Sequence, residues 1–202
     1  MFCRKHGYST RTDPAVLVER LRPHLLNASP GTTAGKQVTA PAMADQLELL
    51  NRQTRNYDTL ITAAVAAHPD GPLFLSFPGI EPIIAATFIG EMGDNRARYP
   101  SAAALLAETG LAPVTRASGH THQVRFRYAA NKRMRHAIDW WMTVAAREDD
   151  WSRTAYDTAR ARNQGRLRAY RGLGARWTRI LWRAWTDHQP YDPTRGHKTL
   201  TA

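Results

Sequence analysis

The stretch TRASGHTHQVRF, residues 115–126, contains residue types that could act on a phosphodiester. Ser118 is followed by Gly119, and two histidines, His120 and His122, come directly after them. A serine hydroxyl is a weak nucleophile that needs activation, and phosphoryl transfer needs positive charge around the phosphate oxygens. Gly119 would let the backbone approach a ligand closely. The stretch is therefore either a solvated turn or a loop whose serine attacks a phosphate.

Positive charge is available on both sides of this serine. Cationic side chains precede it and also follow it in QVRFRY and NKRMRHAIDWWM, at Arg116, Arg125, Arg127, Lys132, Arg133 and Arg135. Asn131 is expected to cap a helix whose first turn contains Lys132, Arg133 and Arg135. Because cations at a helix N-terminus oppose the helix dipole, this cluster predicts an anion nearby. His120 or His122 could assist proton transfer, with a solvated histidine as the alternative.

The charge of the whole chain indicates a polyanionic partner. Its 202 residues carry a formal net charge of +11, and the sequence pI is about 10.5. Sixteen of the 28 Lys and Arg residues lie between Arg116 and Arg183, with only five acids, so this part holds the whole surplus. We therefore expect a nucleic-acid-binding surface in the C-terminal half.

Neither a membrane nor an oxidising compartment is predicted. The longest apolar run, residues 71–90, contains Glu81, three prolines and three glycines, so it cannot form one continuous spanning helix. The N-terminus lacks the apolar segment of a signal peptide. Cys3 is the only cysteine, which excludes an internal disulfide and fits a reducing cytoplasm, where the protein would be nucleoid-associated.

The first part of the chain is predicted to hold two helices and a linker. Asp13 and Pro14 are expected to start a helix, and the Gly-, Pro- and Thr-rich stretch 27–41 to be a linker. A second helix over 41–68 carries an apolar stripe at Leu47, Leu50, Tyr57, Leu60, Ile61 and Val65. Periodicity does not distinguish a bundle helix from a dimeric coiled coil, so both stay open.

The predicted organisation is a linker over 1–37, a coiled-coil-like helix over 38–70, a main domain over 71–193 and a tail over 194–202. Within the main domain, PGI at 78–80 predicts a tight turn before a helix over 82–92. This arrangement resembles a helix-hairpin-helix element, in which N–H groups of Gly79, Ile80 and the following helix bind a DNA phosphate. An ordinary turn is the rival interpretation, and Glu81 would repel a phosphate.

Two long helices are expected to form the core of an all-α, mainly helical fold. The helix over 131–147 should bury Met134, Ile138, Trp141 and Ala145. The helix over 167–186 should bury Trp177, Ile180, Leu181, Ala184 and Trp185. These tryptophans are expected in the core rather than as platforms for stacked bases. The alternation in QVRFRY allows one short strand or hairpin near 123–128.

Six pieces of the sequence occur in the order found in one transposase family: FPGIEPIIAATFIGEMGD, LAETGLAP, ASG, NKRMRHAI, ARWTRILWRAW and YDP. On these pieces the chain resembles the insertion-sequence 110/116/902 transposases, which are bridge-RNA-guided DNA recombinases. The resemblance covers about Leu73 to Pro193. The segments before it resemble the linker and coiled coil of that family.

The resemblance implies a mechanism and a set of partners. Family members combine a RuvC-like domain, which has an Asp-Glu-Asp-Asp metal site, with a helical domain whose serine attacks DNA and links to it covalently. The family's serine falls on Ser118, and Asn131, Arg133 and Arg135 match the basic motif after it. The implied partners are DNA, a guide RNA and further copies of the chain, joined through the helix over 41–68.

This sequence also departs from the family pattern. The residues before Leu73 are too few for a RuvC-like domain, so the chain resembles the C-terminal part of a transposase. Mg²⁺ is expected only with that missing domain, since the acidic run 148–150 cannot converge on one point. Ala130 stands where the family usually has glycine, and Glu81 replaces a turn glycine. The expected function is DNA transposition or site-specific recombination, inactive without the partner domain; the alternative is a non-catalytic nucleic-acid-binding remnant or module.

Overall fold

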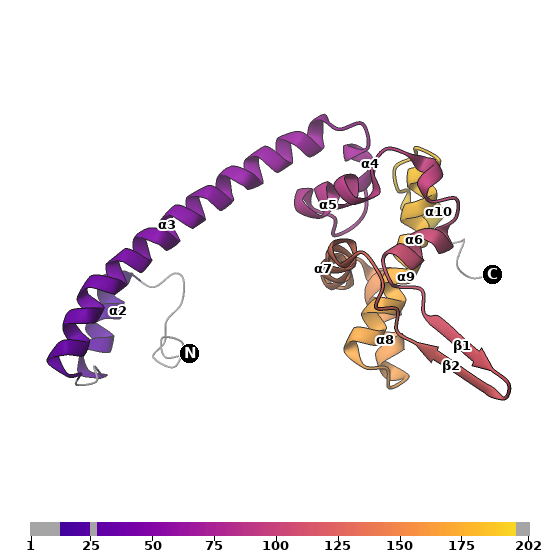
Figure 1. The fold of residues 1–202 in the computed structure, drawn as a ribbon. Coiled ribbons are helices and arrows are strands. Elements are labelled where there is room, and N and C mark those ends of the chain that lie inside the picture. Colours follow the sequence, from indigo (N-terminus) through magenta and orange to yellow (C-terminus); the bar gives the residue numbers. More distant parts are fainter. Residues whose placement is uncertain (1–12, 25–27, 197–202) are drawn as a thin grey trace. The chain divides into compact units, whose positions relative to one another are not determined.

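The computed structural model describes residues 13–24 and 28–196, and the chain divides into two compact units between Thr54 and Arg55 (Figure 1). Cys3, most of the predicted tail and the start of the predicted linker lie outside the described residues. The long helix α3 (Pro30–Ala67) contributes to both units. No helix in the described ranges is long and apolar enough to cross a membrane.

The N-terminal unit contains α2 (Pro14–Leu21), the 3-10 turn η1 (Arg22–His24) and the first part of α3. The carboxylate of Asp13 accepts a hydrogen bond from the N–H of Ala15 at 2.8 Å, and proline occupies the first helical position. Both features satisfy the requirements of a helix start, as the sequence predicts.

The prediction of a linker over 27–41 was wrong, because α3 already begins at Pro30. Ser29 precedes the helix, and its hydroxyl accepts a hydrogen bond from the N–H of Thr32 at 3.3 Å. Threonine hydroxyls of the first turns donate to carbonyls four residues earlier, so these polar side chains are satisfied within the helix. Pro41 lies inside the helix rather than at its start.

The C-terminal unit is a packed group of helices with one hairpin, which confirms the mainly helical fold class (Figure 1). Its helices are α4 (Gly71–Leu75), α5 (Pro82–Met92), η2 (Arg96–Arg98), α6 (Ala102–Glu108), α7 (Lys132–Glu148), α8 (Asp150–Ala161), α9 (Arg166–Thr186) and α10 (Pro193–Gly196). Helix α7 packs against α5, α8 and α9, and α6 packs against α9. The starts and ends of α5, α7 and α9 agree closely with the predicted ranges.

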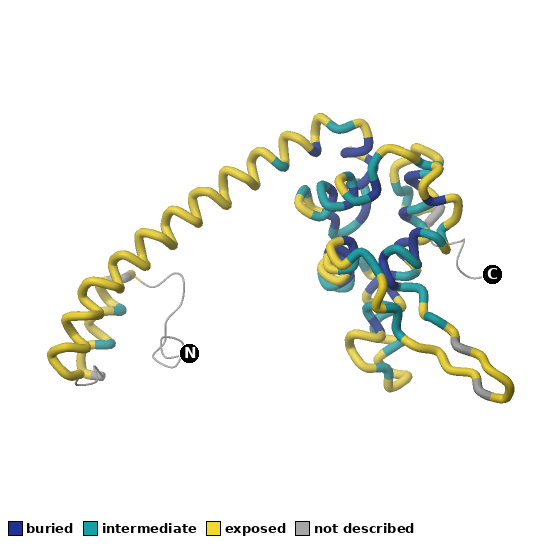
Figure 2. The backbone as a smooth tube through the Cα atoms, in the orientation of Figure 1, coloured by how far each residue is buried: buried dark blue, intermediate teal, exposed yellow. Residues whose placement is uncertain are grey.

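Buried residues gather at the centre of this unit (Figure 2), and many of them are aromatic. Trp177 of α9 has ring centroids of four aromatic residues within 6.0 Å, at Phe77, Trp141, Trp151 and Tyr191. Its indole N–H donates to the Ser152 hydroxyl at 2.8 Å, so its one polar atom is satisfied in the core. The expectation that Trp141, Trp177 and Trp185 are core residues is confirmed, since all three are fully buried.

A two-stranded antiparallel hairpin extends from this helical body (Figure 1). Strand β1 (Val114–Ser118) pairs with β2 (Thr121–Arg125), and the last pair joins residues 118 and 121. The two-residue turn begins with Gly119 at φ +55°, a conformation that glycine adopts without strain. The predicted strand near 123–128 therefore begins earlier and ends at 125. The segment before the turn, predicted as a loop, is its partner strand.

Candidate nucleic-acid interface

Ser118 lies at the exposed end of the hairpin, next to the Gly119 turn. Side chains of directly paired residues share one face of an antiparallel ladder and alternate along each strand. The register therefore places Gln123 and Arg125 on the same face as Ser118, and His122 on the opposite face. The Ser118 hydroxyl forms no hydrogen bond with any residue that the structure describes.

Arg125 supplies an oriented cation on the face that carries Ser118. Its Nε and Nη2 donate to the Oε1 of Gln123 at 3.1 and 2.7 Å, and both side chains are exposed. Arg125 pairs with Val114, which is roughly 14 Å along the strand from Ser118. Backbone pairing places Arg116 opposite Gln123, closer to the serine. A nucleic-acid strand lying along this face from Ser118 would thus reach Arg125 at the base of the hairpin.

The base of the hairpin is held by side chains that we name the hairpin anchor: Phe126, Arg127, Arg135 and Arg171. Arg127 Nε donates to the carbonyl of Ala112 at 3.2 Å, just before β1. Arg135 donates to the carbonyls of Arg127 and Thr109, at 2.8 and 3.2 Å. The guanidinium groups of Arg135 and Arg171 lie 4.6 and 4.9 Å from the centroid of the Phe126 ring. Arg127 and Arg135, predicted to bind nucleic acid, are half-buried here and position the hairpin.

An anion lies beside the cations of the first turn of α7, and it is Glu91 of α5. Asn131 accepts hydrogen bonds from the N–H groups of Arg133 and Met134, at 3.0 and 3.1 Å, which confirms the predicted helix cap. Its side-chain amide donates to Glu91 of α5 at 2.6 Å. The Arg133 guanidinium also pairs with Glu91, at 2.8 Å. Lys132 is exposed and forms no ion pair within the described ranges.

The PGI turn is packed against α7 at the other end of that helix. Trp141 donates its indole N–H to the carbonyl of Pro78 at 2.8 Å, and the N–H of Ile80 donates to Phe77 at 3.2 Å. Gly79 has φ +76°, and a Cβ there would lie 2.9 Å from the backbone nitrogen of Ala145. Since Ile80 is buried and its N–H is engaged, the ordinary-turn interpretation accounts for the geometry of 78–80.

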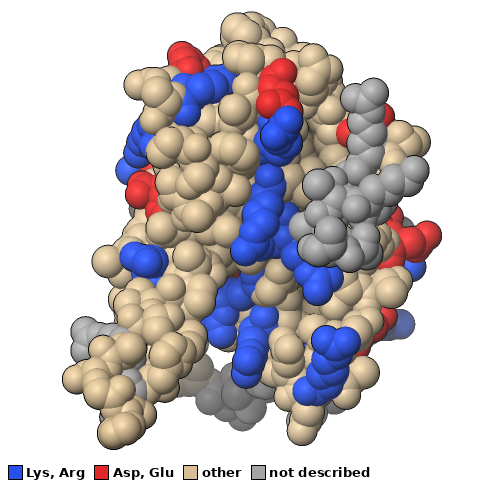
Figure 3. Space-filling model, turned by 90° about the vertical axis from the view of Figure 1, so that its right-hand side faces the viewer, with Lys and Arg blue, Asp and Glu red and all other residues tan. Residues whose placement is uncertain are grey.

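The predicted site residues thus fall into two separate groups. Ser118, Gly119 and Arg125 lie on the hairpin, whose base adjoins the first turn of α7 at Asn131. The turn at 78–80 adjoins Ala145, roughly 20 Å further along α7 at the helical rise of about 1.5 Å per residue. On the face drawn in Figure 3, Lys and Arg side chains gather in a band with acidic side chains near its edges.

No group of three His, Cys, Asp or Glu side chains suited to a metal ion occurs in the part of the chain that the structure describes. In the acidic run 148–150, Asp149 caps α8 by accepting from the Ser152 N–H at 2.7 Å. Asp150 pairs with Arg153 at 3.0 Å. These residues do not fit the four-carboxylate Mg²⁺ site that the resemblance implies.

Comparisons with known proteins identify the family. The sequence profile described as the Transposase IS116/IS110/IS902 family matches residues 71–157. One relative is a protein of Streptomyces coelicolor whose name assigns it as the mini-circle transposase for IS117. It is 33% identical over 137 residues, which cover 68% of this chain and 33% of that protein. The 43.6 kDa protein of insertion element IS110 from the same species is 30% identical over 164 residues, which cover 81% of this chain and 40% of that protein. This chain belongs to the IS116/IS110/IS902 transposase family.

A third relative in this transposase family is the 42 kDa protein of insertion element IS900 from Mycobacterium paratuberculosis. It is 29% identical over 171 residues, which cover 83% of this chain and 43% of that protein. The chain thus spans between 33% and 43% of the length of these transposase-family relatives.

Two residues of the candidate interface, Glu91 and Trp140, were not predicted from the sequence. Glu91 connects α5 to the first turn of α7, and its place in the piece FIGEMGD gave no indication of its partners. Trp140 is exposed beside the buried Trp141. The pair WW does contain a usable indication, because two consecutive helix positions point about 100° apart and cannot both face one core.

Proposed function

We propose that this chain supplies the nucleophilic serine and part of the DNA-binding surface for DNA transposition. The observation that carries the proposal is the position of Ser118, exposed at the end of a hairpin whose base is held by the hairpin anchor. A hairpin fixed at its base and free at its end can insert a hydroxyl group into a DNA groove. The family membership of residues 71–157 supports the same function.

The proposed step joins Ser118 to DNA. Its oxygen forms a bond to phosphorus while the bond from phosphorus to one sugar oxygen breaks, and a phosphoserine ester results. The serine proton passes to a base, and the departing sugar oxygen receives a proton. His122 is on the opposite face, and His120 lies exposed in the turn without a hydrogen bond to Ser118 among the described contacts. We therefore assign the base and the charge neutralisation to a RuvC-like domain from another chain. Any Mg²⁺ would be held there.

Partners follow from the same proposal. DNA would contact exposed cations such as Lys132 and Arg125, so binding should weaken steeply as salt rises, because phosphate contacts release counterions. The exposed apolar stripe of α3 would pair with a second copy of the chain. We further propose that a guide RNA takes part and that the protein acts in the cytoplasm, at the nucleoid.

The test is covalent trapping. The chain is incubated with Mg²⁺, duplex DNA that flanks its own gene, RNA transcribed from that flanking DNA, and a full-length family member whose corresponding serine is replaced by alanine. A DNA adduct on the peptide containing Ser118, found by mass spectrometry, is the expected result. Ser118→Ala should abolish the adduct and leave duplex affinity within about twofold, since a hydroxyl at an exposed tip contributes little to binding. Thr115→Ala, on the same strand and the opposite face, is the matched control.

A second candidate is a nucleic-acid-binding module without chemistry. It is favoured by the free Ser118 hydroxyl, which has no activating partner among the side chains described. Under this alternative the wild-type chain binds duplex DNA with the same salt dependence but yields no adduct in the trapping experiment. That outcome would contradict the first proposal, as would an adduct that persists in Ser118→Ala.

A further inference from the structure

Helices α5 and α7 bound a groove of about 710 Å³ on the C-terminal unit. Its apolar lining includes Ile83, Ile84 and Trp140, and its cationic lining includes Lys132, Arg133 and Arg147. The two helices pack directly against each other, so the groove lies within the C-terminal unit. Neither Ser118 nor the rest of the hairpin lines it.

Trp140 is the unusual side chain of this groove. It is 57% exposed, whereas Trp141 and Trp177 are fully buried. Its indole N–H donates to Nε2 of His136 at 3.0 Å, and the two rings meet edge to face with centroids 6.3 Å apart. Because an indole nitrogen only donates, Nε2 of His136 must accept and the imidazole carries its proton on Nδ1. The polar edge of Trp140 is thereby satisfied, and its exposed ring surface remains for a ligand.

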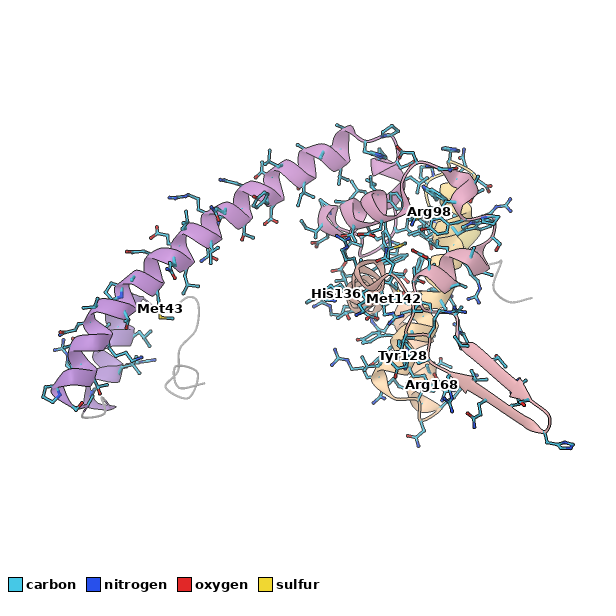
Figure 4. All side chains as sticks on the ribbon, viewed as in Figure 1. Met43, Arg98, Tyr128, His136, Met142 and Arg168 are labelled. Atoms are coloured by element: carbon cyan, nitrogen blue, oxygen red, sulfur yellow. The ribbon has the colours of Figure 1, made fainter. Side chains whose placement is uncertain are left out.

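His136, which accepts the hydrogen bond from Trp140, lies on the side of α7 away from the buried Met142 (Figure 4). A tryptophan restrained in this way loses less side-chain freedom on binding than a mobile one, which favours stacking of a flat ligand on it. An exposed large apolar side chain inside a groove is a common feature of binding sites.

The charges of the groove are arranged at its two ends. Lys132 and Arg133 stand at the start of α7 and Arg147 at its end, roughly 22 Å apart along the helix. Neither Lys132 nor Arg147 forms an ion pair with any side chain in the described ranges, and both are exposed. Glu81 is the acidic residue of the lining, beside the first turn of α5. A ligand that fits has negative groups at its ends and a flat apolar part between them.

We propose that this groove binds a single-stranded segment of several nucleotides, with an unpaired base stacked on Trp140 and phosphates of more distant nucleotides on either side of that base on Lys132 and Arg147. A duplex covers the faces of its bases by stacking, whereas single strands present them to aromatic side chains. The exposed indole of Trp140 favours this ligand over an acidic peptide, because every base presents a flat face for stacking. The inference deepens the proposed function, since it rests on nucleic-acid binding and assigns Trp140 to strands that are not paired.

The experiment compares single-stranded and duplex binding by the full chain. A labelled oligothymidylate and a duplex from the flanking DNA are titrated by fluorescence anisotropy into wild type, Trp140→Ala and Trp140→Phe. Loss of base stacking weakens binding by about five- to 150-fold, so we expect at least fivefold weaker oligothymidylate binding for Trp140→Ala. Trp140→Phe should retain most of the affinity, and duplex affinity should change less than twofold in both variants.

Two further measurements make the assignment specific. The emission that Trp140→Phe removes from the wild-type spectrum should be quenched by oligothymidylate, because stacked bases quench indole fluorescence. Tyr128→Ala is the matched control, since Tyr128 is an exposed aromatic residue outside the groove (Figure 4). Circular dichroism of each variant verifies that the helices are retained.

The outcomes separate this inference from the proposed function. Unchanged oligothymidylate binding in Trp140→Ala, or equal losses for both nucleic acids, overturns the groove assignment while the proposal for Ser118 stands. Equal losses in Tyr128→Ala overturn it as well, as does displacement of oligothymidylate by polyglutamate at equal charge concentration. A wild-type chain that binds neither nucleic acid contradicts both.

Discussion

Helices α3 and α9 have the same kind of sequence pattern and very different surroundings. Each carries apolar residues at helical spacing with charged residues between them. In α9, Trp177 and Leu181 are 0% and 1% exposed. In α3, Leu50 and Leu60 are 57% and 64% exposed, and most of that helix is exposed along its length (Figure 2).

The difference shows that periodicity identifies an apolar face but not what covers it. The face of α9 is covered within the chain, because α6, α7 and α8 all pack against that helix. The face of α3 is covered by nothing in the described chain before Ile61 and Val65, where the helix reaches the C-terminal core. Most helical stability in proteins comes from packing of such a face. The two helices should therefore respond oppositely to substitution and to protein concentration.

The largest effect is expected in α9. Trp177→Ala removes a ring with four aromatic neighbours and leaves a cavity, so the C-terminal unit should lose about 3–5 kcal/mol of unfolding free energy. Urea denaturation at concentrations where the chain is monomeric measures it. Leu60→Ala in α3 is the control and should stay within about 0.5 kcal/mol.

Such a loss approaches the whole stability of a domain, so Trp177→Phe gives a second, smaller step in case the alanine variant does not fold. A destabilisation by Trp177→Ala no greater than that of Leu60→Ala would remove the distinction between the two helices.

A smaller effect is expected in α3, and only on association. Leu47→Glu with Leu50→Glu places charges on the apolar stripe, so self-association should weaken at least about tenfold while the Tm of the C-terminal unit is unchanged. Sedimentation equilibrium measures the first quantity and calorimetry the second. Asn56→Glu with Thr59→Glu adds the same charge on the opposite side of the helix and should leave association unchanged. A wild-type chain that stays monomeric at all accessible concentrations would contradict pairing through α3.

The smallest effect concerns Tyr191. Its ring stacks on Phe77 with centroids 5.1 Å apart, and it lies edge-on to Trp177 with centroids 5.2 Å apart. Burial raises the pKa of its phenol to about 12, and the carboxylates of Asp149 and Asp192 add to the shift. The folded chain therefore holds this proton more tightly than the unfolded chain, whose tyrosines have a pKa of about 10. Stability should be constant just below pH 10 and fall as the pH rises from about 10 toward 12.

Tyr191→Phe should remove that part of the alkaline loss. Unfolding free energy as a function of pH, together with the ultraviolet absorbance of phenolate, measures it. Identical alkaline slopes in wild type and variant would show that the aromatic cluster around α9 is more open to water than its packing indicates.

Local chemistry made several elements predictable. Asp13 and Asn131 accept backbone N–H groups at helix starts, and the apolar spacing of α7 and α9 matches their buried faces. These features depend on residues close together in the sequence. The first strand of the hairpin was not predictable in this way, because β1 is defined by its pairing with β2. The start of α3 was missed because side-chain hydrogen bonds satisfy a composition typical of linkers.

The candidate sites show the same distinction between features set by nearby residues and features set by distant ones. Ser118 and the cations around it are evident from sequence, since their residue types indicate phosphate chemistry. The sequence did not show which arginines are available to a ligand. Arg127 and Arg135 donate hydrogen bonds to backbone carbonyls that are distant from them in the sequence. Glu91 and Asn131 are 40 residues apart and meet only in the fold. The groove at Trp140 likewise exists only because α5 packs on α7.

By itself, the sequence determined the helical fold class, the basic character of the C-terminal half, the capped starts of α2 and α7, and the transposase family. Each of these depends on composition or on residues within a few positions of one another. The tertiary structure alone decided the face of the hairpin on which Ser118 lies, the arginines that anchor it, and the groove beside Trp140. Those outcomes depend on register and packing between distant segments, and no local pattern contains that information.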